Sequence, residues 1–311
     1  MIAVFGASGY IGSHLVNFLI KKKITFVLPS NYKSKGFTFI KDFTSDSIKS
    51  FIKKYKVKTI INLHAQTNIE KSFDDLEYDY EHNVHLTISI LNSIKNLKIN
   101  ITYIFIGTAT QVGFTRIKKS ISLKHISSPL TVFDLNKQYC EDLIKIYKKK
   151  FNINAFTLRL SNVFGPGKKV DNNRGIINKI INNAININEV TVYGNGGYVR
   201  DFIYIDDVVK AIYLAIKFKS KLNENHYYYV SSGKGISFFQ FVNQLKFFIY
   251  KNFQKSLFIK FKPWPKNTHP IDKRSFVGNN KSFKNITGWN PEKNLLVNFM
   301  KYINNFKQFE Q

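Results

Sequence analysis

Hydrophobic residues occur along this chain in short blocks, separated by longer segments in which they recur every three or four positions. The blocks lie at residues 2–5, 24–28, 37–40, 59–63, 101–106 and 155–160. The clearest helical segments are the stripe Leu86, Ile90, Ile94 and Leu97, and the run from Asp134 through Leu143 and Ile146 to Tyr147. Apolar runs that alternate with helical patterns are typical of βαβ units. The pattern therefore predicts an α/β fold, a Rossmann-type doubly wound parallel sheet.

The pattern loosens after Gly165-Pro166-Gly167, where asparagine and aromatic residues become frequent. We predict a first domain at residues 1–164 and a smaller second domain at residues 165–311. Residues 200–216 are expected to return to the first domain.

The first apolar block is followed at once by spaced glycines and then by a helical pattern. Glycine permits a tight turn and a close approach of the backbone to a ligand, and a helix N-terminus offers unpaired N–H groups. A strand, a glycine turn and a helix in this order bind the pyrophosphate of a dinucleotide. A purely structural turn is the alternative, but the strand-to-helix context favours binding. The residues expected to face the dinucleotide are Gly6, Ser8, Gly9, Tyr10, Ile11 and Gly12.

Composition changes this picture little. The chain has 311 residues, 44% of them hydrophobic, which is ordinary for a globular protein. A formal net charge of +27 suggests a polyanionic partner, but 42 of the 47 basic residues are lysines, dispersed in blocks of three at most. This dispersion indicates a solvated lysine surface. We expect no nucleic-acid partner, and nucleic-acid binding is a hypothesis that rests on charge alone.

Other features narrow the class of protein further. No apolar stretch approaches the roughly 20 residues needed to cross a bilayer, so we expect no membrane partner and a cytoplasmic location. The single cysteine, Cys140, excludes an intrachain disulfide and a multi-cysteine metal site. We interpret it as a buried apolar residue on a helix and predict no metal.

Two longer segments, residues 159–166 (RLSNVFGP) and 196–207 (GGYVRDFIYIDD), follow the glycine turn at suitable distances. These two segments, together with the glycine turn, Thr108 and residues 129–137, are the basis of a family resemblance. The chain resembles the extended short-chain dehydrogenase/reductase family of NAD-dependent epimerases and dehydratases of nucleotide sugars, which includes UDP-galactose 4-epimerase-like enzymes. The likeness runs almost from end to end. It implies a nicotinamide dinucleotide, a nucleotide-sugar substrate held by the second domain, and a role in supplying sugars for surface polysaccharide. It also implies a homodimer formed through the helices that carry Leu86 and Leu143.

The same resemblance implies further cofactor contacts along the chain. They are Asp42 and Phe43 at the adenine, Leu63, His64 and Ala65 in the loop after a strand, and Asn31, Asn83, Lys137 and Val163.

The resemblance places catalysis at Thr108, position 133 and Lys137. A nicotinamide accepts hydride from a sugar carbinol only if a base removes the hydroxyl proton, and that base must titrate near neutral pH. In the family a tyrosine does so, because a lysine and the oxidised nicotinamide lower its pKa. Thr108 would contact the reacting oxygen. Asn162, Arg200 and Arg274 would hold the substrate diphosphate, to which a guanidinium binds in a bidentate way that lysine cannot.

Position 133, however, is phenylalanine, which has no hydroxyl to move the proton. Three explanations stay open: an engineered substitution that traps a complex, a natural enzyme that uses another acid, and a protein that binds its ligands without turning them over. The intact Thr108 and Lys137 argue against a long decay of the site. His64 and His125 are candidate substitutes because imidazole titrates in the right range, but the sequence places neither near the sugar.

Two other departures limit the reaction and the cofactor. Ala109 and Thr110 stand where the 4,6-dehydratases of the family carry an Asp-Glu pair, which leaves C4 epimerisation or reduction of a 4-keto sugar. Residues 28–33 lack the acid that binds an unphosphorylated ribose. Ser30, Asn31 and Lys33 could instead accept a 2′-phosphate. The cofactor is therefore NAD or NADP with the balance toward NADP, which in turn favours a reductase.

Overall fold

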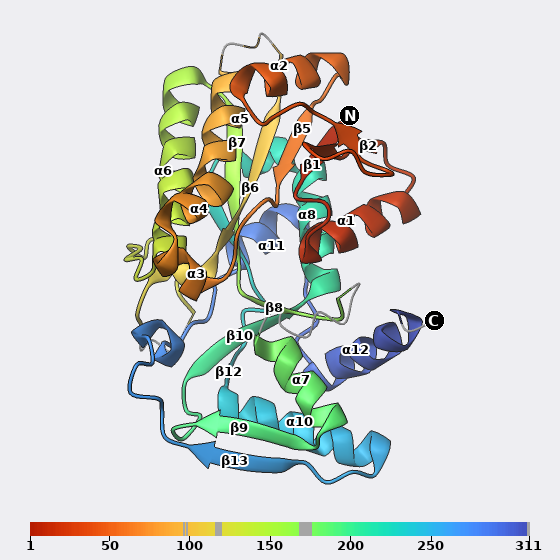
Figure 1. Cartoon of the computed structure of the whole chain (residues 1–311), viewed down its shortest axis with the longest axis vertical. Coiled ribbons are helices and arrows are strands. Elements are labelled where there is room, and N and C mark those ends of the chain that lie inside the picture. Colours follow the sequence, from red (N-terminus) through yellow and green to blue (C-terminus); the bar gives the residue numbers. More distant parts are fainter. Residues whose placement is uncertain (96, 98, 116–119, 168–175, 310–311) are drawn as a thin grey trace.

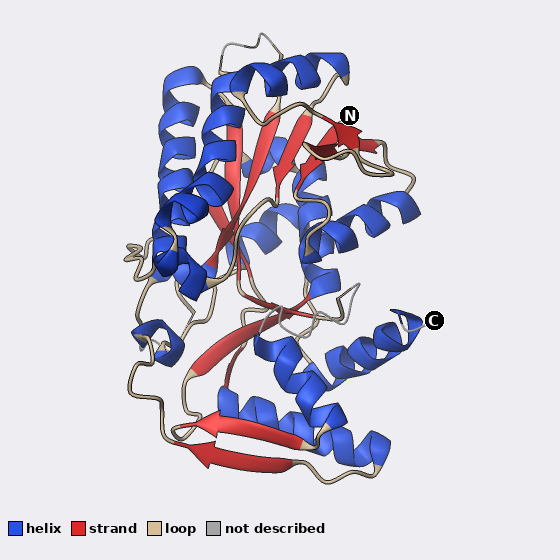
Figure 2. Ribbon diagram, in the orientation of Figure 1, coloured by secondary structure: helices blue, strands red, loops and turns tan. Residues whose placement is uncertain are grey.

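The computed structural model describes residues 1–95, 97, 99–115, 120–167 and 176–309. Figures 1 and 2 show a larger lobe, built on a sheet between two layers of helices, above a smaller lobe that holds the C-terminal helix. The strands are β1 (Ile2–Phe5), β2 (Phe26–Val27), β3 (Pro29–Ser30), β4 (Thr38–Phe39), β5 (Thr59–Asn62), β6 (Thr102–Thr108), β7 (Asn154–Leu160), β8 (Asn162–Phe164), β9 (Glu189–Tyr193), β10 (Val199–Tyr204), β11 (Tyr227–Val230), β12 (Gly235–Ser237) and β13 (Phe258–Lys262).

The helices alternate with these strands. The α-helices are α1 (Tyr10–Lys21), α2 (Ser45–Lys54), α3 (Ile69–Asp74), α4 (Leu76–Tyr80), α5 (Leu86–Ile94), α6 (Val132–Phe151), α7 (Ile176–Asn186), α8 (Ile205–Lys217), α9 (Lys219–Leu222), α10 (Phe238–Phe253), α11 (Lys281–Thr287) and α12 (Leu295–Phe309). The π-helix η1 (Glu81–His85) precedes α5, and η2 (Ala109–Val112) and η3 (Pro270–Lys273) are short 3-10 helices.

Six parallel strands form the sheet of the larger lobe, in the order β11-β7-β6-β5-β1-β2. The chain moves from β1 to β2 on one side and then places β5, β6 and β7 on the other side. The strand order therefore reverses between β1 and β5. In open parallel sheets, ligands bind outside the carboxyl ends of the strands at such a reversal. The predicted Rossmann-type doubly wound sheet is confirmed.

Apolar residues on both faces of the strands explain the layers. Along β1, Ala3 and Phe5 belong to one buried cluster and Ile2 and Val4 to another, because successive side chains point to opposite faces. Helices α2, α5 and α6 cover the first face, and α1, α8 and α11 cover the second (Figure 1). A parallel sheet buried on both faces needs this near-continuous apolar sequence.

Two predicted elements differ from the structure. The block Phe37–Ile40 contributes only β4, which pairs with β3 in a separate two-stranded parallel sheet, and residues 31–37 before it form a loop rather than a helix. These residues offer no apolar stripe, and Gly36 adopts a φ of +83°. A π-helical turn precedes the predicted stripe, which begins at Leu86, the first residue of α5. Helix α5 ends at Ile94, so Leu97 packs on the same core from beyond the helix.

The C-terminal half of the chain returns to the larger lobe. Helix α8 packs against α1, β11 joins the sheet beside β7, and α11 packs on β11. The predicted division after residue 164 does not include this second return. The sequence signal for β11 is only a four-residue run, Tyr227 to Val230, within an aromatic-rich region.

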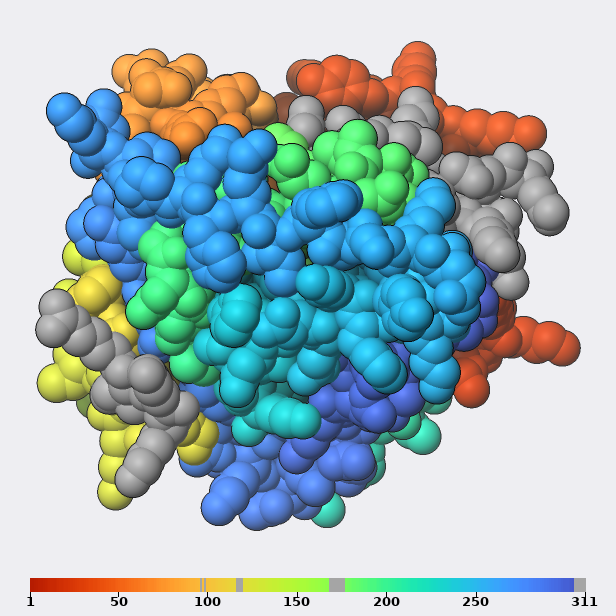
Figure 3. Space-filling view, turned by 90° about the horizontal axis from the view of Figure 1, so that it is seen from below, coloured from red at the N-terminus to blue at the C-terminus, as the bar shows by residue number. Residues whose placement is uncertain are grey.

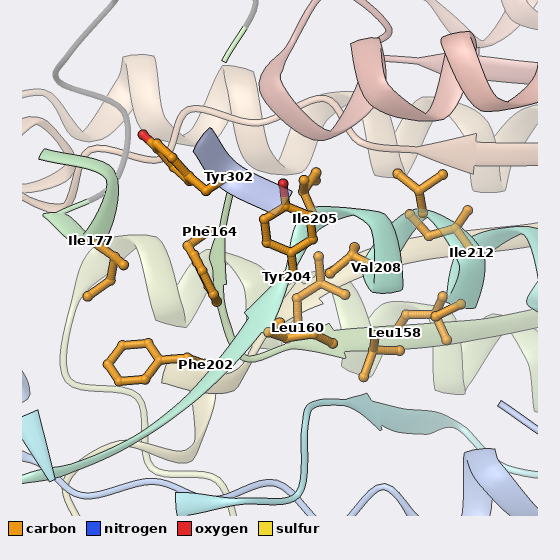
Figure 4. Packing of buried hydrophobic residues seen from close by; sticks show 14 of the residues in the cluster. Leu158, Leu160, Phe164, Ile177, Phe202, Tyr204, Ile205, Val208, Ile212 and Tyr302 are labelled. Carbon is orange, nitrogen blue, oxygen red and sulfur yellow. The ribbon is translucent and has the colours of Figure 1, made fainter. Parts of the chain in front are cut away.

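The smaller lobe combines the three-stranded sheet β12-β10-β8, the pair β13-β9, and helices α7, α10 and α12. Phe164 lies at its centre and contacts Phe202 and Tyr204 in edge-to-face geometry. Figure 4 shows these rings beside Ile205 and Val208, so one apolar core continues from this lobe into the larger one. Figure 3 shows the lobe from below, where α10 and β13 cover the surface.

In the part of the chain that the structure describes, no helix combines the length and the apolarity that a membrane crossing requires. Within the same residues, His, Cys, Asp and Glu side chains form no group of three or more that could hold a metal ion. Cys140 is a buried free thiol.

Candidate functional site

The glycine turn joins β1 to α1 at the carboxyl edge of the sheet. Gly6 has a φ of +77°, and a Cβ there would lie 2.5 Å from the backbone nitrogen of His64. A Cβ on Gly12 would lie 2.2 Å from the Gly6 carbonyl oxygen. Gly9 is the N-cap of α1 and gives no side-chain hydrogen bond to the first turn. The turn therefore needs Gly6 and Gly12, and the N–H groups of the helix N-terminus have no side-chain cap, as an anion site requires.

The rest of this segment is arranged around the turn. Ser8 is exposed, and Ile11 is half-buried. The Tyr10 hydroxyl donates to the carbonyl oxygen of Gly165 at 2.9 Å, so this side chain ties α1 to the loop after β8. Val163, in β8, is half-buried and pairs in register with Ile203 of β10.

The loop after β5 packs against the glycine turn. Leu63, His64 and Ala65 are half-buried, and the His64 ring contacts Phe43 at 6.0 Å between ring centroids. Burial lowers the pKa of His64 to about 4, with further lowering by His82 and Lys137. The His64 imidazole is therefore neutral at neutral pH and a weak base. His125 lies in a separate loop, where its backbone N–H donates to Ser122.

The predicted adenine and ribose contacts lie toward the open edge of the sheet. Asn31 is exposed in the loop between β3 and β4. Asp42 accepts hydrogen bonds from the backbone N–H and the hydroxyl of Thr44 at 3.1 and 2.6 Å. Hydrogen bonds from Ser47 and Thr44 lower the pKa of Asp42 to about 2. Asp42 is thus ionised and holds its own loop.

Asn83 belongs to a buried polar network behind the site. Its side-chain amide donates to Asp79 at 3.0 Å, and its Oδ1 has no partner. Asp79 also accepts from Gln66 at 2.7 Å and from Asn136 at 2.7 Å. The network connects η1, the loop after β5 and α6. An unpaired amide oxygen in a buried position is a candidate acceptor for a ligand N–H.

Thr108, Phe133 and Lys137 come from two neighbouring elements. Thr108 ends β6, and the other two lie in the first turns of α6. The Lys137 ammonium donates to the Ile106 carbonyl oxygen at 3.4 Å and lies 4.8 Å from the Phe105 ring centroid and 5.9 Å from that of Phe133. Burial lowers the pKa of Lys137 to about 8. The structure thus brings Lys137 beside the final residues of β6 and beside the ring at position 133.

Two residues at this place were not among the predicted site residues. Thr110 follows Thr108 by two positions, and their hydroxyl oxygens are 2.8 Å apart. The Thr110 hydroxyl also donates to Oδ1 of Asp134, the residue after Phe133. Asp134 is fully buried, its Oδ2 has no partner, and burial raises its pKa. The sequence does show an acid, Asp134, directly after the expected tyrosine position. Acids in the first turn of a helix, however, commonly only stabilise the helix through its dipole, so this position did not indicate a site residue.

Arg200 and Arg274 lie in contact at the inner side of the smaller lobe. The Arg200 guanidinium donates to the carbonyl oxygens of Arg274 and Asp272 and lies 4.8 Å above the Tyr198 ring. Arg274 donates to the Ile271 carbonyl at 3.1 Å, and its Nε has no partner.

Neither arginine forms a salt bridge within the described residues. Burial and then Arg274 lower the pKa of Arg200 to about 9. Two buried guanidinium groups near each other favour an anion between them, because each raises the energy of the other's charge. Asn162, half-buried in β8, pairs in register with Phe202 of β10, the strand that carries Arg200.

A glycine turn at the reversal of a parallel sheet, followed by a second lobe that closes the strand ends, defines a Rossmann-type dinucleotide-binding fold with an appended lobe. More specifically, the chain belongs to the NAD dependent epimerase/dehydratase family, whose model matches residues 2–230.

Individual relatives modify nucleotide sugars. A putative UDP-glucose 4-epimerase of Methanocaldococcus jannaschii is 28% identical over 230 residues, which are 71% of this chain and 75% of that protein. The dTDP-4-dehydro-6-deoxyglucose reductase of Escherichia coli is 21% identical over 263 residues, 79% of this chain and 81% of the reductase.

Solved structures share the whole architecture. The UDP-glucose 4-epimerase of Thermotoga maritima, with UDP-glucose, matches with a TM-score of 0.83 at 22% identity, covering 100% of this chain and 99% of that one. The UDP-glucuronic acid 4-epimerase of Bacillus cereus, in complex with UDP-glucuronic acid and NAD, matches with a TM-score of 0.79 at 21% identity, covering 99% of both chains. At these identities the structures establish the common fold.

Proposed function

We propose that this chain is an NAD(P)-dependent nucleotide-sugar oxidoreductase that acts at C4 of the sugar, as an epimerase or as a 4-keto reductase, in the supply of sugars for surface polysaccharide. The observation that carries this proposal is a continuous series of contacts. Gly6 packs against the backbone of His64, His64 lies within electrostatic range of Lys137, and Lys137 binds the strand that ends at Thr108. This series of neighbours supports one site that combines the glycine turn with Thr108 and Lys137.

The residues present fit a dinucleotide. Gly6, Gly9 and Gly12 form a turn with no room for a Cβ at its first and last glycines, and the α1 N-terminus is uncapped. These groups would bind the pyrophosphate, while Lys137 would hold the nicotinamide ribose. When bound, the nicotinamide accepts a hydride from C4 of the sugar or returns one to it. Thr108 would accept a hydrogen bond from the reacting hydroxyl and orient it.

The choice between NADP and NAD rests on the loop after β3. This loop presents Asn31 and Lys33 to solvent and contains no acid that would repel a 2′-phosphate. We therefore favour NADP. In calorimetric titrations, Lys33→Ala is expected to weaken NADP binding and to leave NAD binding unchanged. An equal effect on both dinucleotides would contradict this assignment.

Arg200, Arg274 and Asn162 would bind the diphosphate of the sugar nucleotide. The two guanidinium groups are buried and bonded to backbone carbonyls rather than to carboxylates, so their charge is available to an anion. A bidentate contact with phosphate oxygens would also supply a partner for the Arg274 Nε.

The proposal is tested by denaturing the purified protein and identifying any released dinucleotide and sugar nucleotide by mass. Titration with NAD and NADP follows, and then incubation with UDP-glucose, UDP-galactose and a 4-keto sugar nucleotide. A protein that neither carries nor binds a nicotinamide dinucleotide would contradict the proposed function.

Phe133 favours a second candidate, a homologue that binds its ligands without turning them over. Its ring contacts Lys137 as the expected tyrosine ring would, but it carries no hydroxyl. In such a homologue, which lacks any general base, Phe133→Tyr is expected to raise the hydride-transfer rate by about 10²-fold or more, the usual contribution of a general base. Turnover of any sugar nucleotide by the unmodified chain would exclude the silent homologue.

We also propose a homodimer, formed through α6. The side chains of Leu86 and Leu143 pack into the core of this lobe, whereas Leu135, Tyr139 and Ile146 of α6 are 57%, 45% and 59% exposed. An exposed apolar stripe on a helix suits a contact with a second copy. Tyr139→Glu is expected to convert the dimer to a monomer in light scattering. A monomeric unmodified protein would contradict the proposal.

A further inference from the structure

A chain of side-chain oxygens leads from the end of β6 into the first turn of α6. The Oγ1 atoms of Thr108 and Thr110 are 2.8 Å apart, and the Thr110 hydroxyl donates to Oδ1 of Asp134. Thr108 and Thr110 are half-buried, whereas Asp134 has no exposed surface. This series of oxygens therefore begins at partly exposed residues and ends in the interior.

The chemistry of the last member fixes the direction of these hydrogen bonds. An ionised carboxylate only accepts, so Thr110 must donate to Asp134, and the Thr108 hydroxyl must donate to Thr110. The backbone N–H of Thr110 also donates to Thr108 Oγ1 at 3.3 Å. The capping box of η2 gives Thr108 Oγ1 a second backbone donor, the N–H of Gln111, so both lone pairs of this oxygen are used and a substrate hydroxyl would replace one of the two backbone donors. Thr108 is thereby oriented to receive a proton rather than to give one.

We propose that Thr108, Thr110 and Asp134 form a proton relay that takes over the role of the tyrosine absent at position 133. This inference rests on the proposed function and deepens it. In the oxidation direction, a bound oxidised nicotinamide dinucleotide would accept the hydride that leaves as the C–H bond at C4 breaks. The hydroxyl proton moves to Thr108 as the Thr108 proton moves to Thr110 and the Thr110 proton moves to Asp134. The C–O single bond becomes a carbonyl, and reduction reverses each transfer.

The surroundings of Asp134 suit a group that gains and loses a proton. Burial raises its pKa, and the hydrogen bonds from Thr110 and Thr131 together with Arg274 and His269 oppose this rise. Arg274 and His269 belong to the η3 region, so both lobes act on this carboxyl. Oδ2 of Asp134 has no hydrogen-bond partner, so this oxygen does not hold a neighbouring segment in place.

Two other titratable groups, His64 and Lys137, lie near this place, and burial lowers the pKa of each. The pKa of His64 is lowered to about 4, which makes its imidazole a weak base. The pKa of Lys137 is lowered to about 8, so at neutral pH its ammonium has no lone pair to offer, and it donates to the Ile106 carbonyl.

A merely structural role for Asp134 makes a different prediction. In that case the carboxylate connects η2 to α6, and any variant that keeps this hydrogen bond should behave normally. Asp134→Asn keeps an oxygen that accepts from Thr110 and has nearly the same size, but it cannot take up a proton. Thr110→Val keeps the shape of Thr110 and removes the hydroxyl in the middle of the relay. Asp142→Asn, at an exposed position on the same helix, is the matched control.

The first experiment compares these variants in two backgrounds. With Phe133 in place, Asp134→Asn and Thr110→Val are each expected to slow hydride transfer by about 10²-fold or more. With Phe133→Tyr added, the tyrosine supplies the base, and the same variants should change the rate by less than tenfold. A large loss in both backgrounds would show a structural role and overturn the relay. An unchanged rate with Phe133 in place would also overturn it, as would absence of turnover in a protein that binds both ligands.

A second experiment needs no turnover. The carboxyl carbon of Asp134, identified by its loss in Asp134→Asn, is titrated by 13C NMR in the ligand-free protein. Thr110→Val should raise the pKa of Asp134, because the Thr110 hydrogen bond favours the carboxylate. Repeating the titration with His269→Asn separates the His269 charge from this effect. An Asp134 titration that Thr110→Val leaves unchanged would overturn the relay, whereas absence of dinucleotide binding would contradict only the proposed function.

Discussion

Lys137→Met is predicted to make the protein more stable at neutral pH while removing a group needed at the site. Burial lowers the pKa of Lys137 from 10.5 to about 8. One pKa unit corresponds to 1.36 kcal/mol, so keeping this ammonium charged in the folded protein costs roughly 3 kcal/mol. Its hydrogen bond to Ile106 and its contact with the Phe105 ring offset part of this, about 1 kcal/mol each. Methionine fills the same space without charge, so we expect a net gain of about 1–3 kcal/mol.

The pH dependence gives the sharper test. Between about pH 8 and 10.5 the unfolded chain still binds the Lys137 proton and the folded protein does not. The stability of the unmodified protein therefore rises with pH across this range. The advantage of Lys137→Met should be fully present below pH 8 and should shrink toward pH 10.5.

The measurement is urea unfolding of both proteins at pH 7, 8.5 and 10. Lys145→Met, at an exposed position of the same helix, serves as the control and should change stability little. Two results would refute the reasoning: a Lys137→Met protein less stable than the unmodified one at pH 7, or a difference that stays constant with pH. Dinucleotide binding is expected to weaken in Lys137→Met even as the fold becomes more stable.

Other predictions concern the glycine turn and Arg274. Gly12→Ala should lower the free energy of unfolding by about 1–3 kcal/mol in urea titrations, because its Cβ would meet the Gly6 carbonyl at 2.2 Å. Gly9 has a φ of −70°, which alanine adopts readily, so Gly9→Ala should fold normally. Its Cβ would hold the pyrophosphate away from the backbone, so calorimetry should show binding of NADP or NAD weakened at least about tenfold. Arg274→Lys should raise KM for a nucleotide sugar about tenfold or more with little change in kcat, because an ammonium cannot form the two parallel hydrogen bonds that a guanidinium gives to a phosphate. An unchanged KM would show that Arg274 does not bind the diphosphate.

Much of the larger lobe could be predicted from the sequence because its signals are local. The apolar blocks, the helical stripes and the glycine turn each depend on residues close together in the chain, and the sheet they predict is the one observed. The pairing of β11 with β7 could not be predicted in this way. It joins residues about seventy positions apart, and its register depends on the packing of the whole lobe.

The candidate site was predictable where it follows a motif, and not where it follows from packing. Thr108 and Lys137 were expected as members of one site, and the structure places them on adjacent elements. The link from Thr110 to Asp134 was not expected, because it spans 24 positions and depends on how η2 meets α6. The hydrogen bonds from Arg200 to backbone carbonyl oxygens could not be predicted either, because every residue carries a carbonyl and the sequence does not show which one lies near a side chain.

The return of β11 to the sheet has a consequence for how the protein is made. During synthesis, β7 remains an unpaired edge until residue 230 has left the ribosome, and an exposed apolar edge strand is a template for pairing with other chains. A truncated product ending near residue 164 would keep that edge, and we expect it to aggregate. We therefore expect soluble protein only when the chain extends far enough to supply β11.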